Sequence, residues 1–124
     1  MITLTIPEAS PSLNEHKWKH WSKHLRLRKH WLMLVFVAKN EAKIFNAHPV
    51  DPALVRIIRE GHRLLDHDNF VGGAKSLVDS LRDQRLIADD SPAHATFTYE
   101  QRQVPKASYP RTLVEIRRGS SNAA

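Results

Sequence analysis

Apolar and polar residues alternate or recur with clear periods along most of this chain. At its start, isoleucine and leucine alternate with threonine as far as Pro7, a period of two that predicts a β-strand over residues 2–6. Proline and serine are frequent from there to Asn14, which can cap a following helix. Apolar side chains then recur at helical spacing, which predicts one long helix from about residue 16 to about residue 44.

The middle of the chain predicts a second strand. Residues 54–59 are rich in β-branched and other apolar side chains, Gly61 interrupts the run, and residues 63–65 are expected to continue it. The acidic cluster Asp66-His67-Asp68-Asn69 is therefore expected at the point where this strand ends.

A second helix is predicted directly after that cluster. Its apolar residues fall on one helical stripe and are Phe70, Ala74, Leu77, Val78 and Leu81. Asp68 or Asn69 is expected to cap this helix. The pair Gly72-Gly73 weakens the first turn, so the regular helix is expected to begin only near Gly73.

Two further alternating segments, residues 95–104 and 112–118, complete the pattern, and we expect them to pair as an antiparallel hairpin. The resulting order β-α-β-α-β-β predicts a mixed α/β (α+β) fold with one small mixed sheet and two main helices. A single domain is expected over residues 1–118, followed by a disordered tail over residues 119–124.

Composition narrows the classes of protein. A length of 124 residues with 41% hydrophobic side chains suits one compact domain. The chain has no cysteine, which excludes disulfides, thiolate zinc sites and cysteine nucleophiles and fits a reducing, cytoplasmic location. Its longest apolar run, residues 31–38, is far shorter than the roughly 20 residues that cross a bilayer, and the N-terminus lacks the features of a signal peptide. No membrane segment is expected.

The charge pattern indicates a polyanionic partner. The net charge is +6, and residues 1–48 contribute most of it, with eight Lys/Arg against three Asp/Glu. On the predicted first helix, next to Arg28, the cations expected to contact DNA phosphates are Lys17, Lys19, Lys23, Arg26 and Lys29. An ordinary solvated helix face is the alternative.

Three tryptophans and a series of three histidines at i, i+4 and i+8 belong to the same predicted helix. Trp31 falls on the apolar stripe and is expected in the core, whereas Trp18 and Trp21 lie off it and are candidates for base stacking or a dimer contact. The histidines are His16, His20 and His24. Their spacing can bind zinc or nickel, but without a nearby carboxylate we favour a surface or DNA-facing role.

Two short acidic clusters contrast with this basic background, and they are Asp66-His67-Asp68-Asn69 and Asp89-Asp90-Ser91. In an extended strand Asp66 and Asp68 would share one face, and their hard oxygen ligands suit Mg²⁺, or Mn²⁺ as an alternative. Asp89 and Asp90 would complete the metal site if the fold brings them back to the first pair. For either cluster alone, a solvated acidic turn is the common alternative.

These clusters belong to a longer pattern, which comprises Asp66-His67-Asp68-Asn69, Lys75, Asp79, Leu81 and Leu86-Ile87-Ala88-Asp89-Asp90-Ser91. In this order and combination it resembles the RusA family of Holliday junction resolvases, which is common in phages and prophages. Pro11-Ser12-Leu13-Asn14 is similar to that family's N-terminal element. The resemblance covers residues 2–118.

The resemblance implies a Mg²⁺-dependent endodeoxyribonuclease that works as a homodimer on branched DNA, specifically on four-way junctions. It implies Asp66, Asp68 and Asp90 as the essential carboxylates. It also implies Asp89 as a supporting carboxylate and Lys75 as the required basic residue.

The surroundings of Lys75 depart from the family pattern. Compared with shorter members, three extra residues lie within Phe70–Ala74, and the arginine run that can precede the first aspartate is only His62-Arg63. Lys75 nevertheless follows Asp68 by seven positions, which in one continuous helix is two turns and about 10 Å, so its side chain can lean back toward the metal. Asp79 lies one turn further on, and its expected role is an i,i+4 pair with Lys75.

Metal-assisted phosphodiester hydrolysis is therefore the function that the sequence predicts. Two symmetric cuts at a junction require two sites, which favours an isologous dimer. Two alternatives stay open: a non-catalytic DNA-binding module with a structural acidic cluster, and a nuclease for flaps, forks, other branched DNA or RNA. The chain has no Gly-rich phosphate loop, no His-Glu-x-x-His motif and no Gly-x-Ser-x-Gly motif.

Overall fold

The computed structural model describes residues 1–13, 21–45 and 48–119. In chain order its elements are β1 (Ile2–Ile6), α2 (Trp21–Glu41), β2 (Ala53–Gly61), α3 (His67–Gly73), α4 (Lys75–Asp83), β3 (Ala95–Gln103) and β4 (Arg111–Arg118). The mixed α/β class and the order β-α-β-α-β-β are confirmed, with the second predicted helix divided into α3 and α4. None of the described helices is long and apolar enough to cross a membrane. Most of the predicted tail, residues 120–124, lies outside the described residues.

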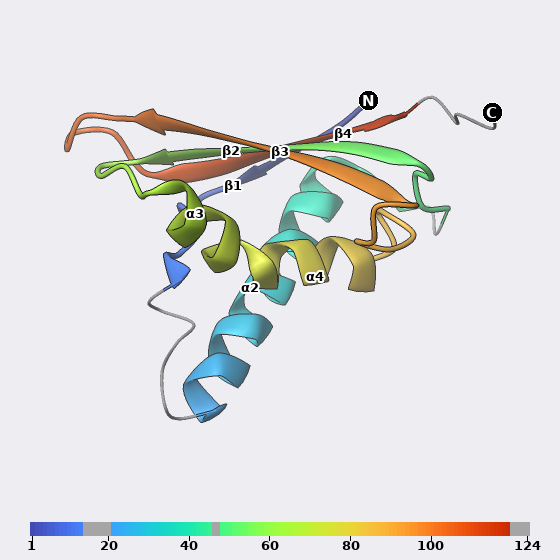
Figure 1. Cartoon of the computed structure of the whole chain (residues 1–124), viewed down its shortest axis with the longest axis horizontal. Coiled ribbons are helices and arrows are strands. Elements are labelled where there is room, and N and C mark those ends of the chain that lie inside the picture. Colours follow the sequence, from blue (N-terminus) through green and yellow to red (C-terminus); the bar gives the residue numbers. More distant parts are fainter. Residues whose placement is uncertain (14–20, 46–47, 120–124) are drawn as a thin grey trace.

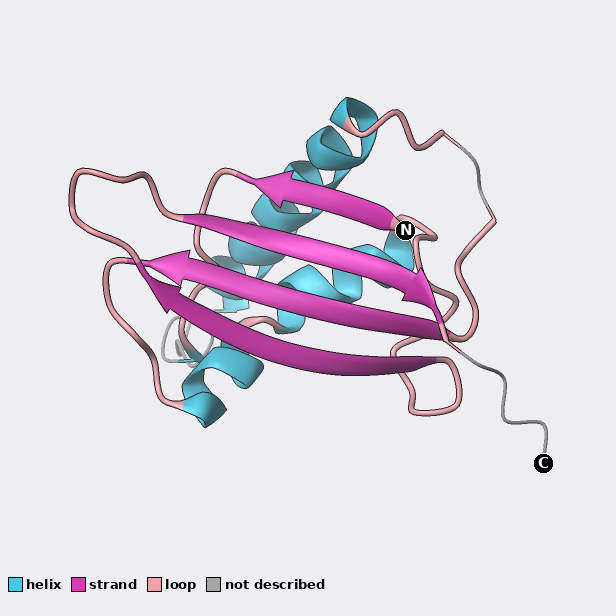
Figure 2. Cartoon of the chain, turned by 90° about the horizontal axis from the view of Figure 1, so that it is seen from above, coloured by secondary structure: helices cyan, strands magenta, loops and turns pink. Residues whose placement is uncertain are grey.

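The four strands form one sheet in the order β1-β4-β2-β3. β4 pairs antiparallel with both β1 and β2, whereas β2 and β3 are parallel. The described helices all lie on one face of this sheet (Figure 1), and the view from above shows that the opposite face carries no helix (Figure 2). The molecule therefore has two layers, with its core between the sheet and the helices.

The predicted hairpin between the last two strands is wrong, because β2 lies between β3 and β4. β2 is the most buried strand, and hydrogen bonds on both of its edges suit it to the centre of the sheet. The chain returns from β2 through α3 and α4, and such a helical crossover places β3 parallel to β2 along one edge. β4 then takes the opposite edge of β2, across a link of seven residues, 104–110.

The core is built from alternating strand positions and one stripe of α2. Leu4 and Ile6 of β1 are fully buried, and so are Val114 and Ile116 of β4. On α2 the buried stripe consists of Trp31, Leu34, Val35 and Ala38, which confirms the predicted packing role of Trp31. The residues of the predicted helix before Trp21 lie outside the described part of the chain, and its C-terminal end is Glu41, three residues earlier than expected.

The predicted continuation of β2 beyond Gly61 is also wrong. The chain leaves the sheet there, and the side chain of Gln101 fixes the following loop: its Oε1 accepts from the Leu65 amide at 2.8 Å, and its Nε2 donates to the Leu65 carbonyl at 2.7 Å. This side chain takes over the hydrogen bonds that a strand partner would have made. The first acidic cluster consequently follows a loop and not a strand.

The Gly72-Gly73 pair has a long-range role. The segment of residues 10–13 crosses α3 so closely that a Cβ on Gly73 would overlap the carbonyl oxygen of Pro11. The same segment is anchored to the sheet, because the Ser10 amide donates to Thr112 Oγ1 and Arg59 Nε donates to the Ser10 carbonyl. Residues 11–13 of the N-terminal motif therefore pack on the glycine pair, just before the helix breaks at Ala74, whereas Asn14 lies outside the described residues.

Candidate functional site

The first acidic cluster forms the start of α3. Asp66 is the N-cap residue, since its Oδ1 accepts a hydrogen bond from the Asn69 amide at 2.9 Å. Its Oδ2 accepts a second one from Asn69 Nδ2 at 2.7 Å. The expectation that Asp68 or Asn69 caps this helix is therefore wrong. Asp66 lies one position before the first residue of α3, and its carboxylate bonds an amide of the first helical turn that would otherwise lack a partner.

Asp68 lies in the first turn of α3 and is exposed. The expected extended arrangement with Asp66 is not formed, because His67 already belongs to the helix and its ring packs edge-on against Tyr99. With the described residues, Asp68 makes no hydrogen bond and no ion pair within 4.0 Å. It is thus a solvated carboxylate that no described cation neutralises, in a chain of net charge +6.

The second acidic cluster is held by local contacts. The backbone amide of Asp90 and the hydroxyl of Ser91 donate to the Asp89 carboxylate, which lowers the pKa of Asp89. Asp90 Oδ1 lies 3.7 Å from Nη1 of Arg82, and Arg82 belongs to the last turn of α4. Both side chains of this ion pair are about one-third exposed, so the contact is weak.

The two acidic clusters lie at opposite ends of the sheet. Asp66 follows the C-terminal end of β2, whereas Asp89 and Asp90 precede the N-terminal end of β3, which is parallel to β2. Nine-residue strands separate these ends by about 27 Å. One chain therefore does not fold Asp89 and Asp90 back to the first pair, and no three His, Asp or Glu side chains of the described ranges are grouped to hold a metal ion.

Lys75 is the first residue of α4 and is exposed. Because the helix is interrupted at Ala74, the two-turn geometry expected between Asp68 and Lys75 in one continuous helix does not apply. The expected pair of Lys75 with Asp79 is not formed either, since Asp79 Oδ1 lies 3.8 Å from Arg82 Nη2. Within the described ranges Lys75 makes no ion pair.

The basic first helix is described from Trp21 onward. Its described cations Lys23, Arg26 and Lys29 are all exposed, as a phosphate-binding face requires. The other predicted contacts, Lys17 and Lys19, lie outside the described residues, and so do Trp18, His16 and His20.

A groove between α2 and α4 was not anticipated from the sequence. Its volume is about 460 Å³, and its lining residues are Leu13, His24, Leu25, Arg28, Gly72, Lys75, Ser76 and Asp79. We call it the α2–α4 groove. His24 and Arg28 are four positions apart in the sequence, and so are Lys75 and Asp79, but only the packing of α2 on α4 shows that all four line the same groove.

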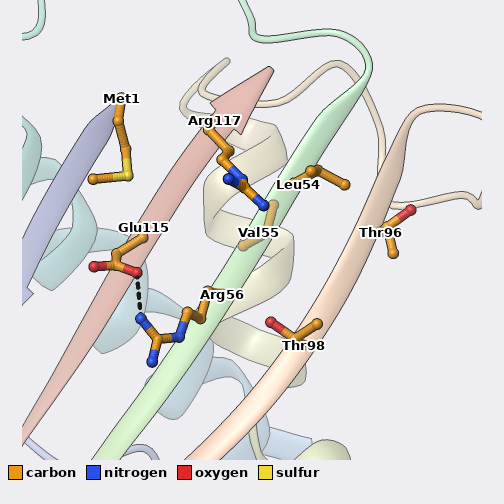
Figure 3. A pocket seen from close by; sticks show the side chains of 8 residues that line it. All are labelled: Met1, Leu54, Val55, Arg56, Thr96, Thr98, Glu115 and Arg117. Carbon is orange, nitrogen blue, oxygen red and sulfur yellow. Dashed lines mark hydrogen bonds and ion pairs between the residues drawn. The ribbon is translucent and has the colours of Figure 1, made fainter. Parts of the chain in front are cut away.

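The helix-free face of the sheet carries a network of ion pairs. Arg56 donates to both carboxylate oxygens of Glu100 at 2.9 and 2.7 Å and to Glu115 at 2.9 Å. These bonds raise the pKa of Arg56 and lower that of Glu100. Beside Arg56 lies a cavity of about 290 Å³ whose lining also includes Leu54 and Arg117 (Figure 3). Charges of both signs alternate here, so this face is not a basic surface for DNA.

Comparison with the models of known protein families finds none that matches the chain, and comparison with curated proteins finds no match either.

Proposed function

We propose that this chain is a metal-dependent endodeoxyribonuclease that cuts branched DNA, with the four-way junction as its substrate and a homodimer as its active form. One observation carries the proposal. Asp68 is an exposed carboxylate that none of the described cations neutralises, although the chain has six more positive than negative groups. An unpaired carboxylate close to bound phosphate repels it unless a divalent cation lies between them.

The donor chemistry fits Mg²⁺. This ion binds through one or two carboxylates together with substrate phosphate oxygens and water, and Asp68 offers one carboxylate without a competing partner among the described residues. When bound, the ion lowers the pKa of a coordinated water and stabilises the leaving oxygen. Asp66, Asp68 and Asp90 would hold it, with Asp89 in support. Lys75 would place its ammonium group against the phosphate.

A site that uses both acidic clusters draws on two subunits, because one chain holds them at opposite ends of β2 and β3. A two-fold axis perpendicular to the sheet would pair the outer edge of β3 with the same edge of a second copy, antiparallel. This arrangement keeps the helices of both copies on one side. It brings Asp68 toward Asp90 of the partner subunit. Phe70 of α3 packs on Tyr99 in the middle of β3, and Leu65, just before α3, is hydrogen-bonded to Gln101 near the C-terminal end of β3.

The outer edge of β3 is free for such pairing in the described part of the chain. Hydrogen bonds from the Ala53 amide to the His94 carbonyl and from the Val104 amide to the Gly61 carbonyl show that even-numbered residues of β3 direct their backbone groups to β2. Odd-numbered residues, such as Phe97 and Tyr99, therefore direct theirs outward. An unpaired strand edge of nine residues is a template for pairing with another chain.

A second function is favoured by a different observation. Three of the four acidic-cluster carboxylates already have local partners: Asp66 caps α3, Asp89 accepts from the turn, and Asp90 pairs with Arg82. Such contacts suit a DNA-binding module whose acidic residues are structural. That module would bind junctions through α2 without cutting them.

Incubation with a synthetic four-way junction, in Mg²⁺ and in EDTA, separates the two functions. We expect paired symmetric nicks on a denaturing gel in Mg²⁺ alone. Asp68→Asn should abolish cutting while junction binding stays equal or becomes tighter, because the amide cannot anchor the cation and no longer repels phosphate. Binding without any nick in the wild type would establish the non-catalytic module. Flap, fork and RNA substrates in parallel lanes test the branched-DNA preference.

A further inference from the structure

The α2–α4 groove combines three chemical features. Leu13 and Leu25 give it apolar walls, and Gly72 leaves one wall without a side chain. Cations lie on both sides, with Arg28 on α2 and Lys75 on α4. One acidic side chain, Asp79, lies within its lining, and this residue is only 8% exposed.

We propose that the α2–α4 groove binds one unpaired nucleotide of a DNA strand, with the base against the apolar walls and the adjoining phosphate between Arg28 and Lys75. This assignment rests on the DNA-directed function proposed above, and it adds a site that selects the base. A volume of about 460 Å³ is in the range of small-ligand pockets, which combine apolar walls with a few polar groups.

Neither cation of the groove has a strong ion pair with the described residues. Lys75 makes no ion pair with the described residues. The ion pair of Arg28 with Asp83 is long, at 3.7 Å, and its side chains are 55% and 38% exposed, so it opposes a phosphate contact only weakly. Two cations on facing helices can therefore contact one phosphate from both sides.

Asp79 gives the groove its chemical selectivity. Its carboxylate accepts hydrogen bonds but cannot donate, and its ion pair with Arg82 at 3.8 Å is longer than a hydrogen bond. The exocyclic amino group of cytosine, adenine or guanine supplies the missing donor, whereas thymine has no such group. The groove should therefore prefer a base with an amino group over thymine. A carboxylate-bearing peptide would be repelled by Asp79, and inorganic phosphate would leave the apolar walls unused.

Three fluorescent single-stranded octamers test this proposal: oligo-dC, oligo-dT and an abasic strand of the same length. Fluorescence anisotropy in EDTA measures binding without cleavage. We expect oligo-dC to bind roughly tenfold more tightly than oligo-dT, because one hydrogen bond to a charged group changes the affinity by about this factor. The abasic strand should bind most weakly.

Variants separate the groove from general charge attraction. Asp79→Asn should remove the difference between oligo-dC and oligo-dT, since an amide can also donate to thymine. Leu25→Ser, on a side chain that is 39% exposed, should weaken both oligonucleotides but not the abasic strand. Lys29→Ala is the matched control on α2 outside the groove, and it should weaken all three probes by the same factor.

Equal binding of all three probes by the wild type would overturn the nucleotide site, whatever the junction assay shows. It would also be overturned if Asp79→Asn kept the difference between oligo-dC and oligo-dT and Leu25→Ser kept the difference between these strands and the abasic strand. Circular dichroism checks that both variants are folded. If Asp79→Asn does not fold, Leu25→Ser alone decides. If the wild type prefers oligo-dC over oligo-dT but makes no Mg²⁺-dependent nicks in the junction, the nucleotide site is supported and the nuclease proposal is contradicted. A failure of one proposal can therefore be told from a failure of the other.

Discussion

Asp66 and Asp68 are two positions apart, yet they have different physical roles. The Asp66 carboxylate uses both oxygens to hold Asn69 at the start of α3. Asp68 makes no such contact with any described residue and is exposed to solvent. A single acidic motif therefore combines a helix cap with a carboxylate that is available to a ligand.

This difference gives a stability prediction. Asp66→Ala should lower the free energy of unfolding by about 1 kcal/mol, the usual loss for a helix cap. Asp68→Ala should change it by less than about 0.5 kcal/mol, as is usual for exposed residues without partners. Urea denaturation followed by circular dichroism measures both values. Equal losses in the two variants would contradict the assignment of Asp66 as the cap.

A second prediction at this scale concerns pH. Glu60 is 8% exposed, and its hydrogen bond with Arg111 lowers its pKa below the ordinary value of 4.5. Because the folded pKa is the lower one, this ion pair stabilises the fold above about pH 4.5, and the stabilisation is lost as pH falls through the folded pKa. Glu60→Gln should therefore be less stable than wild type at pH 7, and the difference should shrink toward pH 3. Urea midpoints across this range check it, and a constant difference would refute it.

At the scale of elements, the junction of α3 and α4 depends on a contact distant in sequence. The segment that contains Pro11 crosses Gly73 with no space for a side chain. Gly72, one position earlier, faces the side chain of Leu13 instead, and that side chain can move. The two neighbouring glycines should therefore respond differently to substitution.

Gly73→Ala should destabilise the protein by about 1–3 kcal/mol, since its Cβ would overlap the Pro11 carbonyl and the backbone must shift. Gly72→Ala is the matched control. We expect it to be near neutral, because the better helix propensity of alanine, worth about 1 kcal/mol, offsets a displaced Leu13 side chain. Thermal and urea denaturation of both variants test this. A tolerated alanine at position 73 would mean that residues 10–13 do not pack here.

At the scale of the whole molecule, the sheet is covered on one face and uncovered on the other. Ion pairs of Arg56 with Glu100 and Glu115, and of Glu60 with Arg102 and Arg111, occupy the uncovered face. Such a face is compatible with water and does not require a second layer. The free edge of β3 is thus the better candidate for contact with a second copy.

A matched pair of variants at Phe97 tests the proposed dimer edge. Both Phe97→Ala and Phe97→Pro remove the ring, but only proline also removes the amide that points outward from β3. We expect Phe97→Ala to remain dimeric and Phe97→Pro to become monomeric and to lose junction cutting. Analytical ultracentrifugation gives the oligomeric state. A dimer that persists in Phe97→Pro would exclude pairing through this edge.

Much of the fold was predictable from local patterns. The alternation up to Ile6 and the helical stripe around Trp31 show which side of each element is apolar. The apolar side is the one that is buried in the fold. The exposed cations of α2 were predictable for the same reason, since charged side chains avoid the core.

The sequence by itself determined the class of fold, the order of its elements, the basic charge and the acidic clusters, because periodicity and composition are properties of neighbouring residues. The tertiary structure decided that β2 separates β3 from β4, that Asp66 caps a helix, and that Asp68 and Asp90 lie at opposite ends of the sheet. Apolar alternation shows which face of a strand is buried but not which edge is paired. Which strands pair along their edges depends on how the connections of the chain cross the sheet. The same connections set the distance between residues that are remote in sequence.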